Sequence, residues 1–170
     1  GCHHVVIGID VGASTGGFTD VLLTRGAVKV YAVDVGQGQL AWKLRNDPRV
    51  VTMEGTNART LTDEDIPDQV DLVVCDASFI GLEKVLPAPM ARAKPGAMLV
   101  ALIKPQFQAG RDLVGKGGVV RDPAVHDAVC ATMRQWLTQD MGWRVFGITE
   151  SPITGPKGNK EFLIVAQAPV

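Results

Sequence analysis

The sequence predicts an α/β protein built on a mostly parallel sheet of seven strands. Apolar, β-branched segments alternate with segments of helical pattern along the whole chain, which is typical of a parallel sheet with helices on both faces. The last two strand-like segments are separated by a loop without a helix. We therefore expect these two strands to pair antiparallel.

The expected strands share an apolar, β-branched core bounded by turn residues. They lie at residues 4–10, 28–35, 50–54, 70–77, 97–105, 143–150 and 161–168.

The expected helices lie between these strands and have clear end signals. They cover residues 16–26, 38–48, 82–93 and 122–142. Pro95 and Gly96 are expected to end the third helix, while Asp122 and Pro123 begin the fourth and Gly142 ends it.

Composition places the chain among ordinary globular proteins of one domain, residues 1–170. Apolar residues make up 46% and charged residues 21% of its 170 residues, as is usual for such domains. The apolar run at 97–103 is too short to cross a membrane, and no signal segment opens the chain. Three scattered cysteines indicate neither a disulfide framework nor a zinc site, so a cytoplasmic location is expected.

Charge is unevenly distributed, although the net charge is only −1. Residues 54–71 hold six acids and one arginine, whereas residues 104–121 hold four bases and one acid. The basic segment includes a long glycine-containing loop, at 106–123, of the kind that often binds substrate. This basic segment could bind phosphates. The alternative is that it is a solvated loop whose charges have no function.

The stretch "DVGASTGG", residues 10–17, follows the first strand, where open parallel sheets bind their ligands. Gly12 and Gly16 would allow close backbone approach, and Gly17 would allow close packing of the helix start. The spacing is neither the dinucleotide fingerprint nor a P-loop, so it does not favour phosphate binding. A tight turn without a ligand remains the alternative.

Two carboxylates indicate what this loop binds. Asp34 ends the second strand, where an acid typically accepts hydrogen bonds from ribose hydroxyls, although it could instead cap a helix. Asp10 would repel a phosphate and face a cationic group. An adenosine cofactor without a pyrophosphate and with a cationic amino-acid tail, S-adenosylmethionine, fits this pattern best, and a nicotinamide cofactor is the alternative.

The whole chain resembles the TlyA/haemolysin A family of FtsJ-like RNA ribose methyltransferases. The resemblance is carried, in the expected order, by "DVGASTGGFTDVLL", "VYAVDVGQGQLAWKLR", "TNAR", "DLVVCDASFI", "LIKPQF", "GGVVRDP" and "SPITGPKGN" followed by "EFL". It implies a Rossmann-like methyltransferase fold, S-adenosylmethionine as cofactor, and 2′-O-methylation of cytidines in ribosomal RNA.

The sequence departs from the family pattern at its start. Family members usually carry an S4-type RNA-binding domain before the methyltransferase domain, and the first lysine of their Lys-Asp-Lys-Glu catalytic set lies just before the first strand. Only "GCHH" precedes that strand here. We therefore expect an excised catalytic domain, and its activity in isolation stays open.

The other three members of the catalytic set match Asp76, Lys104 and Glu161, each at a strand end. A ribose hydroxyl must be aligned with the methyl group and must lose its proton. Lys104, fixed by Pro105, would accept the proton. Asp76 would orient the lysine or the hydroxyl, and Glu161 would hold the lysine or the ribose. The alternatives are that Lys104 merely reaches into solvent, that Asp76 forms a turn, and that Glu161 is an exposed acid at a strand start.

The remaining assignments follow from the resemblance and from position. Asn57 is expected at the adenine edge, with a simple Asx turn as the alternative, Phe79 in the core, and His126 in a structural role. The expected cofactor-binding residues are Asp10, Gly12, Ala13, Ser14, Gly16, Gly17, Phe18, Asp34, Val35, Asn57, Ala58 and Asp76. The expected contacts to RNA phosphates are Arg111, Lys116, Arg121 and Lys157.

Three other functions compete with RNA methylation. A nicotinamide-dependent oxidoreductase would need a different glycine spacing. A non-catalytic RNA- or ribosome-binding protein is favoured by the missing lysine. A pore-forming haemolysin would need an amphipathic or membrane-spanning segment, which the sequence lacks. Ribosomal RNA or a ribosomal subunit is the expected partner, no membrane or metal is expected, and the oligomeric state stays open.

Overall fold

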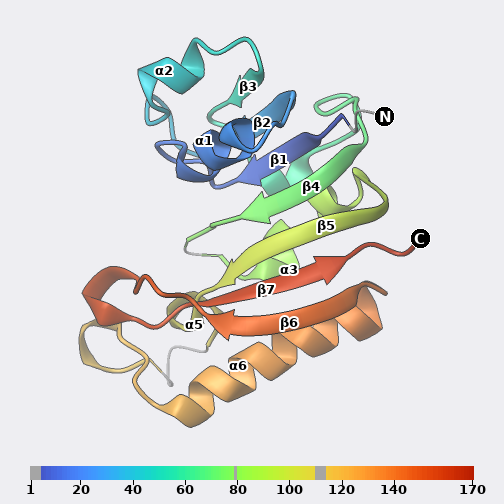
Figure 1. The fold of residues 1–170 in the computed structure, drawn as a ribbon. Coiled ribbons are helices and arrows are strands. Elements are labelled where there is room, and N and C mark those ends of the chain that lie inside the picture. The colour runs from blue at the N-terminus through green and yellow to red at the C-terminus, as the bar shows by residue number, and fades with distance from the viewer. Residues whose placement is uncertain (1–4, 79, 110–113) are drawn as a thin grey trace.

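The computed structural model describes residues 5–78, 80–109 and 114–170, and these form a seven-stranded sheet (Figure 1). The strand order is β3-β2-β1-β4-β5-β7-β6. The strands are β1 (Ile7–Val11), β2 (Lys29–Val33), β3 (Val50–Met53), β4 (Val70–Cys75), β5 (Ala93–Ile103), β6 (Arg144–Glu150) and β7 (Phe162–Gln167).

Strand direction follows the sequence prediction. The pairs from β3 through β5 are parallel, and β7 runs antiparallel to both β5 and β6. The α/β architecture with an antiparallel end is therefore confirmed. The chain builds outward from β1 to β3 and then returns to place β4 on the other side of β1. This switch point is where open α/β sheets bind ligands.

Short helices connect most of the strands. They are α1 (Gly17–Thr24), α2 (Trp42–Arg45), α3 (Leu82–Val85), α4 (Pro87–Met90), α5 (Pro105–Gln108) and α6 (Pro123–Gln135), which continues as the wider turn η4 (Trp136–Asp140). Single helical turns lie at η1 (Ala58–Thr60), η3 (Lys116–Gly118) and η5 (Pro156–Gly158). Asp122 caps α6 by accepting a hydrogen bond from the Ala124 amide at 2.9 Å, as the sequence predicts.

The expected helix at 82–93 is wrong in extent. The segment instead forms α3 and α4, which meet at Leu86. Pro87 and Pro89 have no N–H to donate to a continuous helix, which accounts for the division. β5 already begins at Ala93, so Pro95 and Gly96 lie inside a strand rather than ending a helix. The second helix is also shorter than expected, with only 42–45 helical.

Two apolar clusters lie on opposite faces of the sheet. Val30 and Ala32 of β2 belong to the smaller cluster, whereas Tyr31 and Val33 belong to the larger one, as the period of two along a strand requires. Leu23 of α1 and Leu44 of α2 complete the smaller cluster. The larger cluster takes its helical side chains from α3, α4 and α6: Leu82, Val85, Met90, Val129 and Met133. Helices thus cover both faces.

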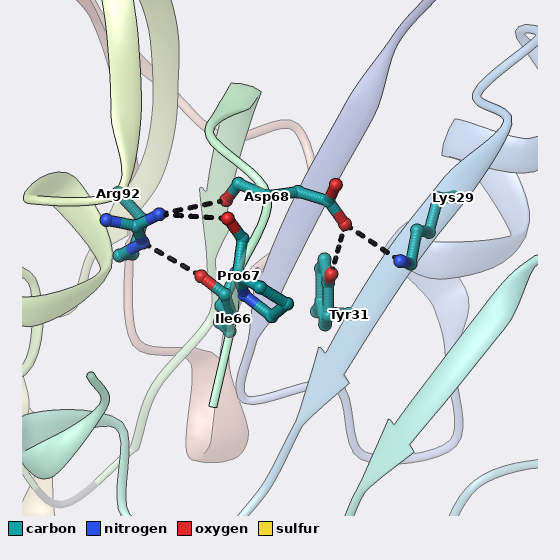
Figure 2. A network of polar contacts seen from close by, with 6 residues as sticks. All are labelled: Lys29, Tyr31, Ile66, Pro67, Asp68 and Arg92. Carbon is teal, nitrogen blue, oxygen red and sulfur yellow. Dashed lines mark hydrogen bonds and ion pairs between the residues drawn. The ribbon is translucent and has the colours of Figure 1, made fainter. Parts of the chain in front are cut away.

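A polar network ties the connection before β4 to β2 and to the turn before β5 (Figure 2). The Asp68 carboxylate accepts hydrogen bonds from the Lys29 ammonium at 2.8 Å and from the Tyr31 hydroxyl. The Arg92 guanidinium donates to the backbone carbonyls of Ile66 and Pro67 at 2.9 and 3.3 Å. Lys29 starts β2 and Asp68 precedes β4, so this network lies at the amino ends of the parallel strands.

We expect Asp68→Ala to lower the free energy of unfolding at pH 7 by about 1–2 kcal/mol, because it removes a charged acceptor from a partly exposed pair and leaves the Tyr31 hydroxyl without it. The bond from Lys29 lowers the pKa of Asp68. Its contribution is therefore present above the ordinary carboxyl pKa and is lost as the pH falls through the lowered pKa. Urea unfolding at several pH values measures this effect. Asp63→Ala, at an exposed position of the same connection, is the control, and equal stability of the two variants would contradict the prediction.

Candidate active site

A cavity of about 280 Å³ opens at the carboxyl ends of β1, β2 and β4. Seven of the predicted cofactor-binding residues line it: Gly12, Ser14, Asp34, Val35, Asn57, Ala58 and Asp76. The predicted cofactor-binding set lacks the polar residues Gln39, Thr56 and Ser78 and an apolar wall formed by Val11, Val33, Ala77, Ile80 and Val85. Part of this wall could have been suspected, because Val11 follows the first predicted strand and Val33 lies near the end of the second.

Gly12 is required by the protein's own backbone. Its φ is +78°, and a Cβ there would lie 2.4 Å from the carbonyl oxygen of Asp76. Its amide donates to the Val33 carbonyl at 2.9 Å, so the loop passes closely between the ends of β2 and β4. An L side chain has no space in this position.

The other two loop glycines have different roles. A Cβ on Gly16, whose φ is +102°, would lie 2.2 Å from Cδ1 of Leu44, so Gly16 lets α2 pack against the start of α1. Gly17 is exposed, and no atom lies within 4 Å of a Cβ built on it. The expectation that Gly17 allows close packing of the helix start is therefore wrong.

Asp34 joins two loops through backbone amides. One carboxylate oxygen accepts a hydrogen bond from the Ser14 amide at 2.6 Å, and the other accepts one from the Gly36 amide at 2.8 Å. The neighbouring helices begin after Gly16 and Ala41, so Asp34 caps neither of them. The position expected for a ribose-binding carboxylate, at the end of β2 and in the cavity wall, is thus the observed one.

Asn57 fulfils the Asx-turn interpretation while also lining the cavity. Its Oδ1 accepts a hydrogen bond from the Arg59 amide at 3.0 Å and begins η1. The preceding amide of Thr56 donates to the Asp34 carbonyl at 2.9 Å. The "TNAR" segment is therefore held against the end of β2.

Asp10 is buried behind the loop and is not part of the cavity wall. The Thr19 hydroxyl donates to Asp10 Oδ2 at 2.7 Å, while Asp10 Oδ1 is buried without a hydrogen-bond partner in the described residues. Burial is the main cause that raises the pKa of Asp10 to about 6, with smaller contributions from Asp76 and Asp34. The predicted residues Ala13, Gly16, Gly17 and Phe18 also lie outside the cavity wall, in the loop and the first turn of α1.

Lys104, which is buried, forms an ion pair beside the cavity with Asp76, which is partly exposed. Lys104 follows β5 and is only 9% exposed, which excludes a lysine that reaches out to solvent. Its ammonium also donates to the Ser78 hydroxyl at 3.0 Å. Asp76 and Ser78 line the cavity, so the cluster connects the lysine to the space where a ligand would lie. The position of Ser78, two residues after the predicted Asp76, was the available signal for it.

Glu161 has a different partner from the one expected. It is 7% exposed, so it is not an exposed acid at a strand start, and β7 begins one residue later. Its carboxylate accepts a hydrogen bond from Gln106 Nε2 at 2.9 Å. Glu161 forms no ion pair with Lys104, because the Lys104 ammonium lies against Asp76 and Ser78 at the end of β4. Of the two roles expected of Glu161, direct contact with the lysine is absent from this structure, and holding the ribose stays a prediction.

The basic loop is described only in part. Phe79 and Arg111 lie outside the described residues, Lys116 begins η3, and Arg121 and Lys157 are exposed. RNA contacts by these bases stay a prediction. His126 has the expected structural role, since its Nε2 lies 2.9 Å from the Val120 carbonyl oxygen and its ring contacts Phe162.

Neither a membrane span nor a metal centre is found in the described ranges. No helix there is long and apolar enough to cross a bilayer. These ranges also contain no group of three or more histidine, cysteine or acidic side chains that could hold a metal ion.

We expect Asp10→Asn to change how stability depends on pH. The pKa of Asp10 is raised to about 6. Its contribution to the free energy of unfolding is therefore fully present below the ordinary carboxyl pKa and is lost as the pH rises through 6. From pH 4 to pH 7 the free energy of unfolding of the unaltered protein should fall relative to that of Asp10→Asn by roughly 2–3 kcal/mol. Denaturant unfolding across this range measures the difference, and parallel pH profiles would contradict it.

Comparisons with known proteins agree with this geometry. Residues 3–168 match the model of the FtsJ-like methyltransferase family. The chain is 55% identical over 157 residues to the 16S/23S rRNA (cytidine-2′-O)-methyltransferase TlyA of Mycobacterium tuberculosis, covering 92% of this chain and 58% of that protein. A solved structure from Streptococcus thermophilus, described as a candidate hemolysin, superposes with a TM-score of 0.92 at 46% identity over 96% of this chain and 59% of that one.

A more distant structure supports the fold alone. A SAM-dependent methyltransferase from Methanosarcina mazei superposes with a TM-score of 0.64 at 18% identity, over 99% of this chain and 95% of that one. The chain spans somewhat more than half the length of the M. tuberculosis relative. From its sequence match and its sheet order, the chain belongs to the FtsJ-like methyltransferase family.

Proposed function

We propose that this chain binds S-adenosylmethionine in the cavity and transfers its methyl group to a ribose 2′-hydroxyl of ribosomal RNA. The observation that carries the proposal is the ion pair of the buried Lys104 with Asp76, beside a cavity whose charged lining residues, in the described part of the chain, are both carboxylates. The M. tuberculosis relative is named for the same reaction.

The cavity suits this cofactor better than a dinucleotide. Its apolar wall offers a surface for an adenine ring, and Asp34 lies where ribose hydroxyls can donate hydrogen bonds. Asp76 would attract the cationic methionine part. A pyrophosphate would be repelled by these two carboxylates, which disfavours a nicotinamide cofactor. When bound, S-adenosylmethionine would supply an electrophilic methyl group.

The protein's own side chains would position the hydroxyl and move its proton. Lys104 Nζ lies between Asp76 and Ser78 at the end of the cavity, so a hydroxyl entering there would meet the amine. Asp76 holds this nitrogen in place. Proton acceptance requires Lys104 to meet the hydroxyl as the free amine. Alignment of the hydroxyl with the methyl group would provide much of the remaining rate.

Ribosomal RNA as substrate rests on the relatives and on the basic loop. Arg121, just before α6, and Lys157, in the loop before β7, are exposed, and the resemblance implies an S4-type RNA-binding domain ahead of the methyltransferase domain. Activity on ribosomes would place the protein in the cytoplasm. We call this chain joined to an S4-type domain, with the upstream lysine restored, the extended protein.

We expect Asp34→Ala to weaken S-adenosylmethionine binding by roughly 1.5–3 kcal/mol, because it removes hydrogen bonds to a charged acceptor. Isothermal titration calorimetry on this chain measures the affinity. Asp63→Ala, which removes an exposed carboxylate, is the control. Unchanged affinity in Asp34→Ala, or tighter binding of NAD than of S-adenosylmethionine, would count against the proposal.

We expect Lys104→Ala in the extended protein to lower methyl transfer by about 10²–10⁴-fold, the usual contribution of a positioned base, and to leave cofactor affinity nearly intact. Transfer of labelled methyl to ribosomal RNA, with ribose and base products separated, measures the rate. Lys84→Ala, at an exposed position of α3, is the control. Label on a base, or full activity in Lys104→Ala, would overturn the 2′-hydroxyl mechanism.

A further inference from the structure

A second polar pair, the half-buried Gln106 and the buried Glu161, lies at the same sheet edge as Lys104. Ile103 and Phe162 form the pair of the β5–β7 ladder nearest this edge. Lys104 follows Ile103 and Glu161 precedes Phe162, so both residues come directly beyond the ladder. Gln106 stands two residues after Lys104, in α5. One chain turn at the end of β5 therefore provides both the lysine and the partner of Glu161.

The Glu161 carboxylate is enclosed by this pair and by the loop between β6 and β7. Gln106 Nε2 donates to Glu161 Oε2 at 2.9 Å. A Cβ on Gly155 would lie 2.3 Å from the same oxygen and 3.3 Å from Gln106 Nε2. The φ of Gly155 is not in the left-handed region, so a side chain there would conflict with the Glu161 carboxylate in its present position rather than with the backbone. The loop thus passes directly over the carboxylate.

Stability alone does not explain the Gln106–Glu161 pair. Gln106 Oε1 is buried and accepts no hydrogen bond within the described residues, and a buried polar atom without a partner lowers stability. Glu161 is buried beside a neutral amide. Replacing both partners of a hydrogen bond by apolar side chains of similar shape can be nearly neutral for stability. What the amide supplies is a fixed direction for the carboxylate, without an added charge.

We propose that Gln106 is a positioning residue that holds the Glu161 carboxylate in place for methyl transfer. This inference rests on the proposed function. Gln106 acts through Glu161, and Glu161 acts on the ribose or its neighbouring groups. Since Lys104 is held by Asp76 and Ser78 on the β4 side, Gln106 provides the equivalent support on the β7 side.

Three variants of the extended protein separate positioning from stability. Gln106→Leu removes the donor and keeps an apolar side chain of similar size. Gln106→Glu places a second carboxylate against Glu161. The double variant Gln106→Glu/Glu161→Gln restores one amide–carboxylate bond with its direction reversed. Gln135→Glu, at an exposed position of α6, is the control for added charge.

We expect Gln106→Leu to lower kcat by about 10–100-fold, as a displaced catalytic group does, with S-adenosylmethionine affinity unchanged. Gln106→Glu should transfer methyl faster at pH 6 than at pH 8 relative to the unaltered protein. The reason is that repulsion between the two adjacent carboxylates raises the pKa of one of them. When that group is protonated, it can donate the hydrogen bond that the Gln106 amide makes in the unaltered protein. The double variant should regain thermal stability but not kcat, because its carboxylate lies on the wrong residue. Labelled-methyl transfer and thermal unfolding measure these outcomes.

Two results would overturn the assignment. Gln106→Leu with unaltered kcat shows that Glu161 needs no support from the amide. A double variant that regains both stability and kcat shows that the pair is structural only. Failure of the unaltered extended protein to transfer methyl overturns the proposed function itself, and with it the role of Gln106. The thermal data on Gln106→Glu and the double variant still report whether the contact exists.

Discussion

The site depends on the close passage of the first loop over the end of β4. Gly12 lies where any side chain would meet the Asp76 carbonyl oxygen, and the Asp76 amide in turn donates to the Val11 carbonyl at 2.9 Å. The ends of β1 and β4 are thereby fixed relative to each other on both sides of the switch point. Because Asp76 also holds Lys104, this backbone contact sets the position of the candidate base. Gly12, which the sequence indicates as part of a ligand-binding loop, is therefore also required by the packing of the backbone.

Negative charge is concentrated behind and around the cavity. Asp34 and Asp76 line it, and the buried Asp10 lies close enough for both to raise its pKa. Three carboxylates in one region oppose folding through mutual repulsion, and among the described residues a cationic side chain is paired only with Asp76. A cationic ligand would relieve that repulsion, whereas an anionic one would increase it. Such an arrangement would favour a cationic ligand by its charge alone, before any specific hydrogen bond forms.

Sheet topology and strand-end residues were accessible from the sequence, while the side-chain partners were not. Alternating segments place Asp34, Asp76 and Lys104 at strand ends, where the structure has them. Pro87 and Pro89 divide the third helix because they lack a backbone N–H. The apolar pattern of the segment, taken alone, predicts one continuous helix. Whether Lys104 pairs with Asp76 or with Glu161 depends on side-chain directions across β4, β5 and β7, which no single segment encodes. Gln106 could not be recognised for the same reason, since its partner lies 55 residues away.

The position of β7 has a consequence for the order in which the site is assembled. β7 is made after every other strand of the sheet, yet it inserts between β5 and β6 rather than adding at an edge. A growing chain can therefore join Asp76 to Lys104 as soon as β5 has formed, but Glu161 reaches Gln106 only when β7 has entered its place. Until then β5 exposes an unpaired edge. Completion of the site and closure of that edge are thus one event, so a chain that stops short of β7 would present half of the site together with a surface prone to aggregation.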